Sequence, residues 1–400
     1  MSGLNFLNKL LDGVDVEWLS LGELGDFIRG NGLQKKDFVE SGFPAIHYGQ
    51  IYTRYGLSAD KTFTYVLPEL ANKLRKAQKN DLLLATTSEN DEDVVKPLAW
   101  LGDNVAISGD MMLFRHEQNV KYLAYFFQSE IFQTQKMKYI TGAKVRRVSS
   151  GDLSKIKIPI PCSNNPEKSL TIQSEIVRIL DRFTALTAEL TAELNMRKKQ
   201  YNYYRDQLLS FDEDEVEWKM LGDLGENLDS KRKPITSGLR EAGSIPYYGA
   251  SGIVDYVKDY IFDGDFLLIS EDGANLLARN TPIAFSISGK SWVNNHAHVI
   301  KFDSYAERRY VEYYLNSIDL APYISGAAQP KLNKKNLESI RIPNPSPEDK
   351  ERIVSILDKF DALTNSINEG LPREIELRQK QYEYYRDLLF SFPRPETASN

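Results

Sequence analysis

Basic side chains gather at two places in a chain whose net charge is −6. The first cluster lies between residues 136 and 157, where seven Lys or Arg stand against a single acid, Asp152. Its members are Lys136, Lys138, Lys144, Arg146, Arg147, Lys155 and Lys157, and the second cluster consists of Lys231, Arg232, Lys233 and Arg240. Such side chains neutralise the phosphates of nucleic acids and supply much of the affinity for them. A solvated charged surface explains either cluster equally well. The position of the clusters in the fold therefore has to distinguish DNA binding from simple solvation.

Side chains that could read bases accompany both clusters. Reading a sequence requires groups that reach base edges, while phosphate contacts hold those groups in register. In the first half of the chain the candidates are Gln34, Lys35, Lys36, Tyr48, Gln50, Tyr52, Thr53, Arg54, Lys144, Arg146 and Arg147. In the second half they are Lys231, Arg232, Lys233, Tyr247, Tyr248, Ser251, Ser270, Glu271, Asp272, Asn275, Asn294, Asn295 and Lys331. Arg146 and Arg147 are the leading candidates.

Residue patterns that would carry catalysis or bind a cofactor are missing from the sequence. There is no Asn-Pro-Pro-Tyr motif for amino methylation, no glycine-rich S-adenosylmethionine loop and no phosphate loop. The acidic run Glu89–Asp93, followed by Lys96, lacks the partners of a nuclease site and is expected to be a solvated loop. Cys162 is the single cysteine, and His296 and His298 alone are too few to hold a metal. We therefore expect no catalytic residue, cofactor site or metal site.

Length and hydropathy place the chain among soluble proteins of several domains. Four hundred residues exceed what one core usually organises, which favours two or three domains. Apolar runs such as Phe266–Ile269 are far shorter than the roughly 20 residues of a membrane span. The N-terminus has neither a basic region nor a cleavage site, so we expect a cytoplasmic protein.

Several segments of the chain occur twice, which determines the interpretation of the fold. The matching pairs are Val16–Gly25 with Val216–Gly225, Ile140–Ala143 with Ile324–Ala327, Gly151–Pro161 with Lys335–Pro345, Ile176–Thr187 with Ile353–Thr364, and Arg197–Phe211 with Arg378–Phe392. Each half thus has an opening strand, a domain, an extended exit rich in Ile and Pro, and a long helix. Between these shared flanks the two domains differ, which suggests two modules with one task and two targets.

The elements that position the candidate residues follow from local patterns. Runs such as Asp81–Thr87 and Asp265–Ser270 predict strands, and helices are expected at Val120–Phe132 and Ala306–Ser317. The fold class is therefore mixed α/β with a pseudo-twofold duplication. The predicted parts are an N-terminal segment (1–16), a first domain (17–161), a central helical region (162–211), a second domain (212–345) and a C-terminal helical region (346–400).

Both helical regions have heptad seams that predict an antiparallel coiled coil. The first seam contains Ile172, Ile176, Ile179, Phe183, Leu186, Leu190, Leu194, Tyr201, Tyr204 and Leu208. The second contains Ile353, Ile356, Phe360, Leu363, Ile367, Ile375, Tyr382, Tyr385 and Leu389. A tandem TAELTAEL at 187–194 produces a stutter in the first, and Pro372 is expected to break the second. Independent amphipathic helices, each packed on its own domain, remain the alternative.

With these features the chain resembles the HsdS specificity subunits of Type I restriction-modification systems. The TAEL tandem, RKKQYNYYRDQLLSF and RQKQYEYYRDLLFSF are similar to the subclass with TAEL repeats in its central helix. The resemblance covers roughly two fifths of the chain, in the flanks and helices. Across Phe27–Val148 and Glu226–Leu332 only the general character matches, so the bases that each domain reads stay open.

The resemblance implies a non-catalytic subunit with two target-recognition domains, which reads a bipartite DNA sequence. Its partners would be two HsdM methyltransferase subunits, which hold S-adenosylmethionine and methylate adenine at N6. HsdR subunits, which use ATP and Mg, would translocate and cleave DNA. Two TAEL copies would correspond to a spacer of about six base pairs, consistent with the rise of a helix. A coiled-coil scaffold without DNA contact and a self-contained restriction-modification enzyme are the alternatives.

Overall fold

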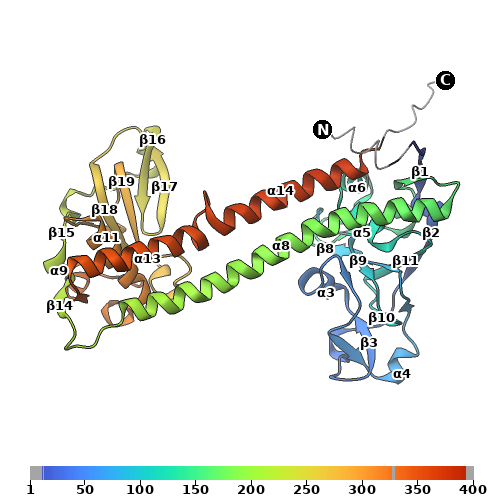
Figure 1. Ribbon diagram of the computed structural model, residues 1–400, viewed down its shortest axis with the longest axis horizontal. Helices are drawn as coiled ribbons and strands as arrows, with labels where there is room; N and C mark the ends of the chain where they lie inside the picture. The colour runs from blue at the N-terminus through green and yellow to red at the C-terminus, as the bar shows by residue number, and fades with distance from the viewer. Residues whose placement is uncertain (1–10, 12, 327–328, 393–400) are drawn as a thin grey trace. The chain divides into compact units, whose positions relative to one another are not determined.

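The computed structural model describes residue 11 and residues 13–326 and 329–392. By its internal contacts the chain divides into two compact units, whose elements are labelled in Figure 1. Unit 1 contains the chain up to Glu189 and again from Ile375, and unit 2 contains Leu190–Glu374. Each unit therefore combines one domain with helix from both halves of the sequence. Among the described residues no helix is long and apolar enough to cross a membrane.

Unit 1 contains two small mixed sheets. The five-stranded sheet has the order β2-β11-β7-β9-β4, and the four-stranded sheet has the order β5-β3-β10-β6. Their strands are β2 (Gly25–Arg29), β11 (Met111–His116), β7 (Leu82–Ala85), β9 (Lys96–Trp100), β4 (Ser58–Ala59), β5 (Thr64–Val66), β3 (Phe43–Ile46), β10 (Val105–Ile107) and β6 (Lys76–Ala77). The predicted strand in Asp81–Thr87 is β7, and all four of its side chains are buried. The strand is apolar throughout because it is covered on both faces.

Short helices complete the first domain. They are α2 (Leu21–Leu24), α3 (Tyr48–Thr53), α4 (Pro68–Ala71), α5 (Val120–Gln128), α6 (Glu130–Lys136) and α7 (Ser150–Leu153). The single helix predicted at Val120–Phe132 is wrong in one respect, because Ser129 divides it into α5 and α6. The buried hydroxyl of Ser129 accepts from the backbone N–H of Phe132 and so caps the start of α6.

Unit 2 contains one six-stranded sheet with the order β15-β20-β18-β19-β16-β17. Its strands are β15 (Glu226–Asn227), β20 (Ala297–Lys301), β18 (Phe262–Ser270), β19 (Ala284–Val293), β16 (Ala242–Gly249) and β17 (Gly252–Val257). The helical elements are η3 (Asp229–Lys231), η4 (Ser237–Leu239), α9 (Leu221–Leu224), α10 (Asn275–Ala278), α11 (Tyr305–Ser317), η5 (Ala321–Tyr323) and α12 (Lys334–Glu338). The helix predicted at Ala306–Ser317 is confirmed as α11.

The repeated flanks close each domain in the same way. In unit 1 the opening strand β1 (Val16–Ser20) pairs antiparallel with the exit strand β13 (Lys157–Pro161). In unit 2 β14 (Glu217–Met220) pairs antiparallel with β21 (Arg341–Asn344). The duplicated flanks therefore form the same two-stranded sheet in each unit, called the clasp: β1 with β13 in unit 1 and β14 with β21 in unit 2. Each clasp brings the start and the end of its domain together.

The central helix α8 (Pro166–Leu209) is an unbroken helix of 44 residues. From residue 167 to its end it has neither Gly nor Pro, so nothing in its sequence interrupts the backbone ladder. The TAEL tandem at 187–194 lies inside it, and the boundary between the two units falls within the tandem, after Glu189. The side chains of the tandem are exposed or half-buried.

The C-terminal region forms two helices, α13 (Pro347–Asn365) and α14 (Gly370–Phe390). The prediction of a break at Pro372 is wrong in position, since the helix ends before Ser366. Two backbone N–H groups of the linker donate to the Ser366 hydroxyl, and Gly370 then adopts a φ of +74°. A Cβ at Gly370 would lie 2.3 Å from the carbonyl oxygen of Ala362. Pro372 lies in the first turn of α14, where its missing N–H is not needed.

Aromatic pairs join the helices of the two repeats. In unit 1 the ring of Phe183 on α8 stacks on Tyr385 of α14, with centroids 5.2 Å apart. In unit 2 the equivalent residues exchange roles, and Tyr204 of α8 stacks on Phe360 of α13 at 5.8 Å. Early α8 thus meets late α14, and late α8 meets α13. This order confirms an antiparallel pair and excludes helices that pack only on their own domains.

Each domain is also fastened to the helix of its own repeat by an equivalent trio of side chains. In unit 1 Asp181 of α8 accepts from Tyr125 at 2.7 Å and from Lys121 at 2.5 Å, both on α5. In unit 2 Asp358 of α13 accepts from Tyr313 at 2.6 Å and pairs with Arg309 at 3.0 Å, both on α11. These two trios are called the docking trios. They connect two domains of different sequence to the duplicated helices by the same chemistry.

Candidate nucleic-acid interface

The first candidate group, Gln34 to Lys36, lies on an exposed turn, η1 (Lys35–Asp37). Gln34, His47 and Tyr48 line a hollow of about 380 Å³ beside this turn. Burial and the charge of Lys35 lower the pKa of His47, and its Nδ1 accepts from the backbone N–H of Gly49. The turn therefore presents two cations, Lys35 and Lys36, next to a hollow that Arg29 and Asp110 also line.

The second group, on α3, divides into framework and exposed residues. Gln50 is buried, and its Oε1 accepts from the backbone N–H of His47 at 2.9 Å. The hydroxyl of Tyr52 donates to the carbonyl of Thr87 at 2.9 Å, and burial together with Asp93 raises its pKa. These two side chains hold α3 in place. Thr53 and Arg54 are the exposed members of the group.

The third group lies on β12 (Arg146–Arg147), which pairs antiparallel with β8 (Thr87–Ser88). Lys144 and Arg147 are exposed. Arg146 is half-buried, because its guanidinium pairs with Asp91 at 2.8 Å and donates to the carbonyl of Gly142 at 2.5 Å. The acidic run is thus not wholly a solvated loop, since Asp91 neutralises one of the two leading candidates.

Lys136, from the basic cluster between residues 136 and 157, does not reach the surface. Its side chain is fully buried, and its ammonium donates to the carbonyls of Glu92 at 2.8 Å and Val94 at 3.0 Å. Burial lowers its pKa to about 8, although Asp93, Asp91 and Glu92 partly oppose the shift. Lys136 therefore stabilises the acidic segment through the backbone carbonyls of Glu92 and Val94, and its ammonium cannot contact a ligand.

In the second domain the candidates again divide by exposure. Lys231, Lys233, Ser251, Asn295 and Lys331 are exposed. Six others are engaged within the domain: Arg232, Tyr247, Ser270, Glu271, Asn275 and Asn294. Asp272 pairs with His296 at 2.8 Å, and the half-buried Tyr248 packs on Phe285.

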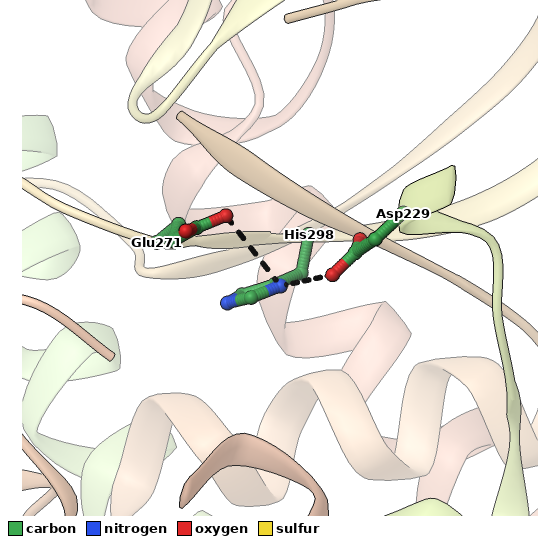
Figure 2. A group of neighbouring side chains, drawn as sticks. All are labelled: Asp229, Glu271 and His298. Atoms are coloured by element: carbon green, nitrogen blue, oxygen red, sulfur yellow. Dashed lines mark hydrogen bonds and ion pairs between the residues drawn. The ribbon is translucent and has the colours of Figure 1, made fainter. Parts of the chain in front are cut away.

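Arg232 and Glu271 belong to a buried group of charges that sequence reasoning missed. Asp229, Glu271 and His298 bring their polar atoms within 4.8 Å of one another, and Figure 2 shows one ring nitrogen of His298 linked to both carboxylates. Arg232 lies 2.6 Å from Glu271 and 3.3 Å from Asp229, and Lys331 lies 3.1 Å from Glu271. The only signal in the sequence was a histidine within an apolar strand.

These residues do not fit a metal ion. The Nε2 of His298 lies 2.7 Å from the carbonyl of Leu332, and its Nδ1 lies 2.6 Å from Asp229, so both ring nitrogens are already engaged within the protein. The cationic groups of Arg232 and Lys331 already contact the carboxylate oxygens that would coordinate an ion. The group, called the His298 network, is therefore held together by hydrogen bonds and ion pairs among its own side chains.

Comparison with known proteins supplies the biological context for this geometry. The sequence model of the Type I restriction modification DNA specificity domain matches twice, at residues 13–197 and 213–377. The specificity subunit of the Type I restriction enzyme EcoR124I/EcoR124II from Escherichia coli is 42% identical across the full length of both chains. The EcoprrI specificity subunit, also from E. coli, is 37% identical, with 92% of this chain and 93% of that subunit covered.

Solved structures agree on the fold. The crystal structure of the S subunit of a Type I restriction-modification system from M. genitalium matches with a TM-score of 0.57, at 16% identity and over 96% of this chain and 98% of that one. A second structure, from work on the assembly and conformational transition of the Type I system, also has a TM-score of 0.57, over 94% of this chain and 97% of that one at 15% identity. Two copies of the domain and full-length relatives show that the chain belongs to the specificity subunits of Type I restriction-modification systems.

Proposed function

We propose that the chain is a non-catalytic subunit in which each domain reads one half of a bipartite DNA target. The observation that carries this proposal is the duplicated frame around unlike centres. The clasps and docking trios are equivalent in the two units, whereas the sheets that they support differ. Recognition of a two-part DNA sequence requires two different DNA-binding surfaces. Here the same clasps and docking trios support two different sheets.

The DNA-facing residues we propose are the exposed members of the candidate groups. In the first domain they are Gln34, Lys35, Lys36, Thr53, Arg54, Lys144 and Arg147. In the second domain they are Lys231, Lys233, Ser251, Asn295 and Lys331. The Lys and Arg side chains among them would contact the phosphates of the DNA, and the amide and hydroxyl groups would reach base edges. Gln50, Tyr52, Arg232 and Glu271 would act behind these surfaces as supports.

The partners follow from the family. We propose that two HsdM subunits, which hold S-adenosylmethionine, dock on the helices and methylate adenine at N6 in each half-site. HsdR subunits would add ATP- and Mg-dependent translocation and cleavage. The proposed parts of the chain keep the boundaries 17–161 and 212–345 for the two target-recognition domains, 162–211 and 346–400 for the helical regions, and 1–16 for the N-terminal segment.

The proposal is tested by purifying the chain alone and together with HsdM. Transfer of a labelled methyl group to mixed genomic DNA should require both proteins, and sequencing of the methylated DNA should return one motif with two separated halves. Methyl transfer by the isolated chain would make it an enzyme in its own right. If the complex bound DNA without any sequence preference, the chain would be a scaffold and not a specificity subunit.

A further inference from the structure

The sequence repeat extends beyond the clasps into the two domains themselves. The matching pairs Ile140–Ala143 with Ile324–Ala327 and Gly151–Pro161 with Lys335–Pro345 have the same offset along the chain, so they belong to one continuous stretch, called the shared block. Seven residues separate the two parts of the shared block, and three of them keep their chemical character: a cation, an apolar residue and a helix cap. They are Arg147 with Lys331, Val148 with Leu332, and Ser149 with Asn333.

In unit 1 the shared block begins with a short hairpin, residues 141–147. Thr141 and Arg147 exchange two backbone hydrogen bonds, each of 2.9 Å. Gly142 has a φ of +93°, and a Cβ there would lie 2.1 Å from the carbonyl oxygen of the third residue after it, so a side chain would collide with the backbone. On its other side the backbone of Arg147 pairs with Thr87, two residues after the end of β7.

Unit 2 has the equivalent hairpin at 325–331, of which the structure describes 325–326 and 329–331. Ser325 and Lys331 exchange two backbone hydrogen bonds of 2.9 and 2.8 Å. Gly326 has a φ of +83°, and a Cβ there would lie 2.5 Å from the carbonyl oxygen of the third residue after it. On its other side Lys331 bridges to Asp272, two residues after the end of β18. The two hairpins therefore hold their cations in the same backbone pairing.

Both cations point outward. Successive side chains of a strand point to opposite faces, and the next residue, Val148 in unit 1 and Leu332 in unit 2, is buried. Arg147 is exposed and has no ion-pair partner among the described residues. Lys331 pairs with Glu271 at 3.1 Å, although 52% of its side chain is exposed. Each hairpin therefore presents a positive charge at the surface.

The sheets around the two hairpins differ. Unit 1 has a five-stranded and a four-stranded sheet, whereas unit 2 has one six-stranded sheet. A hairpin that is kept in two otherwise different domains should contact a group that is the same in both half-sites. The bases of the two half-sites differ, but the phosphates of a duplex carry no sequence information. An exposed cation is suited to a phosphate, whose charge it neutralises.

We propose that Arg147 and Lys331 are equivalent DNA contacts, each of which binds a phosphate at the same position of its half-site and contacts no base. This inference rests on the proposed function. Base recognition then belongs to residues that the two domains do not share, such as Gln34 and Asn295. A phosphate requires a positive charge but not the planar fork of arginine, since lysine binds phosphate as a point charge. The presence of Arg in one hairpin and Lys in the other agrees with such a contact.

The experiment uses the full chain in complex with HsdM and two duplexes, one with the mapped methylation motif and one without it. Binding is titrated at several salt concentrations for Arg147→Ala, Lys331→Ala and the double variant. Each single variant should lower the slope of log affinity against log salt by about one, and the double variant should lower it by about two. The affinity for the two duplexes should fall by the same factor, and methylation mapping should return the wild-type motif.

Two further variants test whether the charge and its position are what matters. Arg147→Lys combined with Lys331→Arg keeps both charges and should restore the wild-type salt slope and motif. Lys155→Ala removes another exposed cation of the shared block, which pairs with Asp152 at 2.8 Å and has Ser339 at its equivalent position. This variant should keep the wild-type salt slope. An equal loss of slope in Lys155→Ala would overturn the assignment to the two hairpin cations.

Loss of discrimination at a single base pair in either alanine variant would indicate a base contact and would overturn the inference, as would an unchanged salt slope. Alanine keeps the backbone hydrogen bonds of the hairpins, so the melting temperatures should stay close to that of the wild type. If an alanine variant failed to fold, the reciprocal exchange would still decide, because a changed motif or salt slope there would contradict phosphate contacts. If the wild-type complex returned no two-part motif, the proposed function would fail, while the salt slopes would still show whether the two cations bind phosphates.

Discussion

Arg146 and Arg147 are neighbours on β12, but their guanidinium groups have different surroundings. Arg146 is paired with Asp91, whereas Arg147 is exposed and has no ion-pair partner among the described residues. The charge of Arg147 is therefore available to DNA, while that of Arg146 is largely neutralised. The two residues looked equivalent in the sequence, and their difference arises from the return of the 88–93 segment beside β12.

Arg147→Ala should weaken DNA binding more than Arg146→Ala does. If Arg147 contacts a phosphate, binding to all sequences falls alike and the slope of log affinity against log salt decreases by about one. If it contacts a base, the loss is about 1–3 kcal/mol at one position of the motif. Binding titrations at several salt concentrations measure both quantities.

Arg147→Lys is the matched control, because lysine keeps the charge but loses the planar fork. It should restore a phosphate contact and fail to restore a bidentate base contact. If the affinity and the salt slope of Arg147→Ala and of the Arg146→Ala/Arg147→Ala double variant equal those of the wild type, β12 lies outside the interface.

Lys136 predicts a pH dependence of stability with a definite sign. Its pKa is about 8 in the fold against an ordinary value of 10.5, so between these values the unfolded chain binds more protons than the folded chain. Its contribution to the free energy of unfolding therefore increases as the pH rises through this window. The difference in melting temperature between wild type and Lys136→Met should shift in favour of the wild type from neutral to alkaline pH. A difference that is constant with pH would show that the ammonium is not buried as described.

At the scale of elements, the docking trios predict domain-specific effects. Asp358→Asn should cost about 1–3 kcal/mol of local stability, because Arg309 is only 13% exposed and loses a charged partner. Asp181→Asn should cost less, below about 1 kcal/mol for the ion pair, since Asp181 is 38% exposed. Hydrogen exchange should accelerate in α11 for the first variant and in α5 for the second. Acceleration in both helices for either variant would contradict independent docking.

We expect the length of the TAEL tandem to set the number of base pairs between the two half-sites. Four residues lengthen a helix by about 6 Å and rotate it by a net 40° or so. One base pair advances about 3.4 Å and rotates about 35°, so the rotations nearly agree. Since α8 is continuous through the tandem, a third TAEL inserted after Leu194 should lengthen the spacer by about one base pair with both half-sites unchanged.

Mapping methylated adenines by single-molecule sequencing measures this directly. A matched control replaces the two TAEL copies with another helix-forming sequence of equal length, which should keep the spacer. An active insertion variant with the original spacer would mean that the tandem is only a stretch of high helix propensity.

At the scale of the whole molecule, the sequence predicts the clasps and the long helices better than it predicts which side chains form the DNA-binding surfaces. The clasps, the long helices and their antiparallel order follow from repeated segments and heptad seams, which are local patterns. The break before Ser366 was placed wrongly, because the hydroxyl of Ser366 and the positive φ of Gly370 outweighed the more familiar signal of Pro372.

The candidate site depends on contacts that no local pattern reports. Asp229 and His298 are 69 residues apart in the sequence and 2.6 Å apart in the fold. Burial of Arg232, Glu271 and Lys136 likewise depends on which loops return to cover them. Composition could therefore identify basic and polar segments, but it could not separate exposed side chains from those that support them.

The central claim, two independent readers in one frame, is tested most directly by exchanging residues 27–148 for the corresponding segment of a relative. The donor should supply a cation and a tyrosine at positions 121 and 125, so that the docking trio with Asp181 survives. The exchanged chain is expressed with HsdM, and methylated adenines are mapped across the genome. We predict that one half of the motif changes, while the other half and the spacer length stay the same. A motif in which both halves change together would contradict the account.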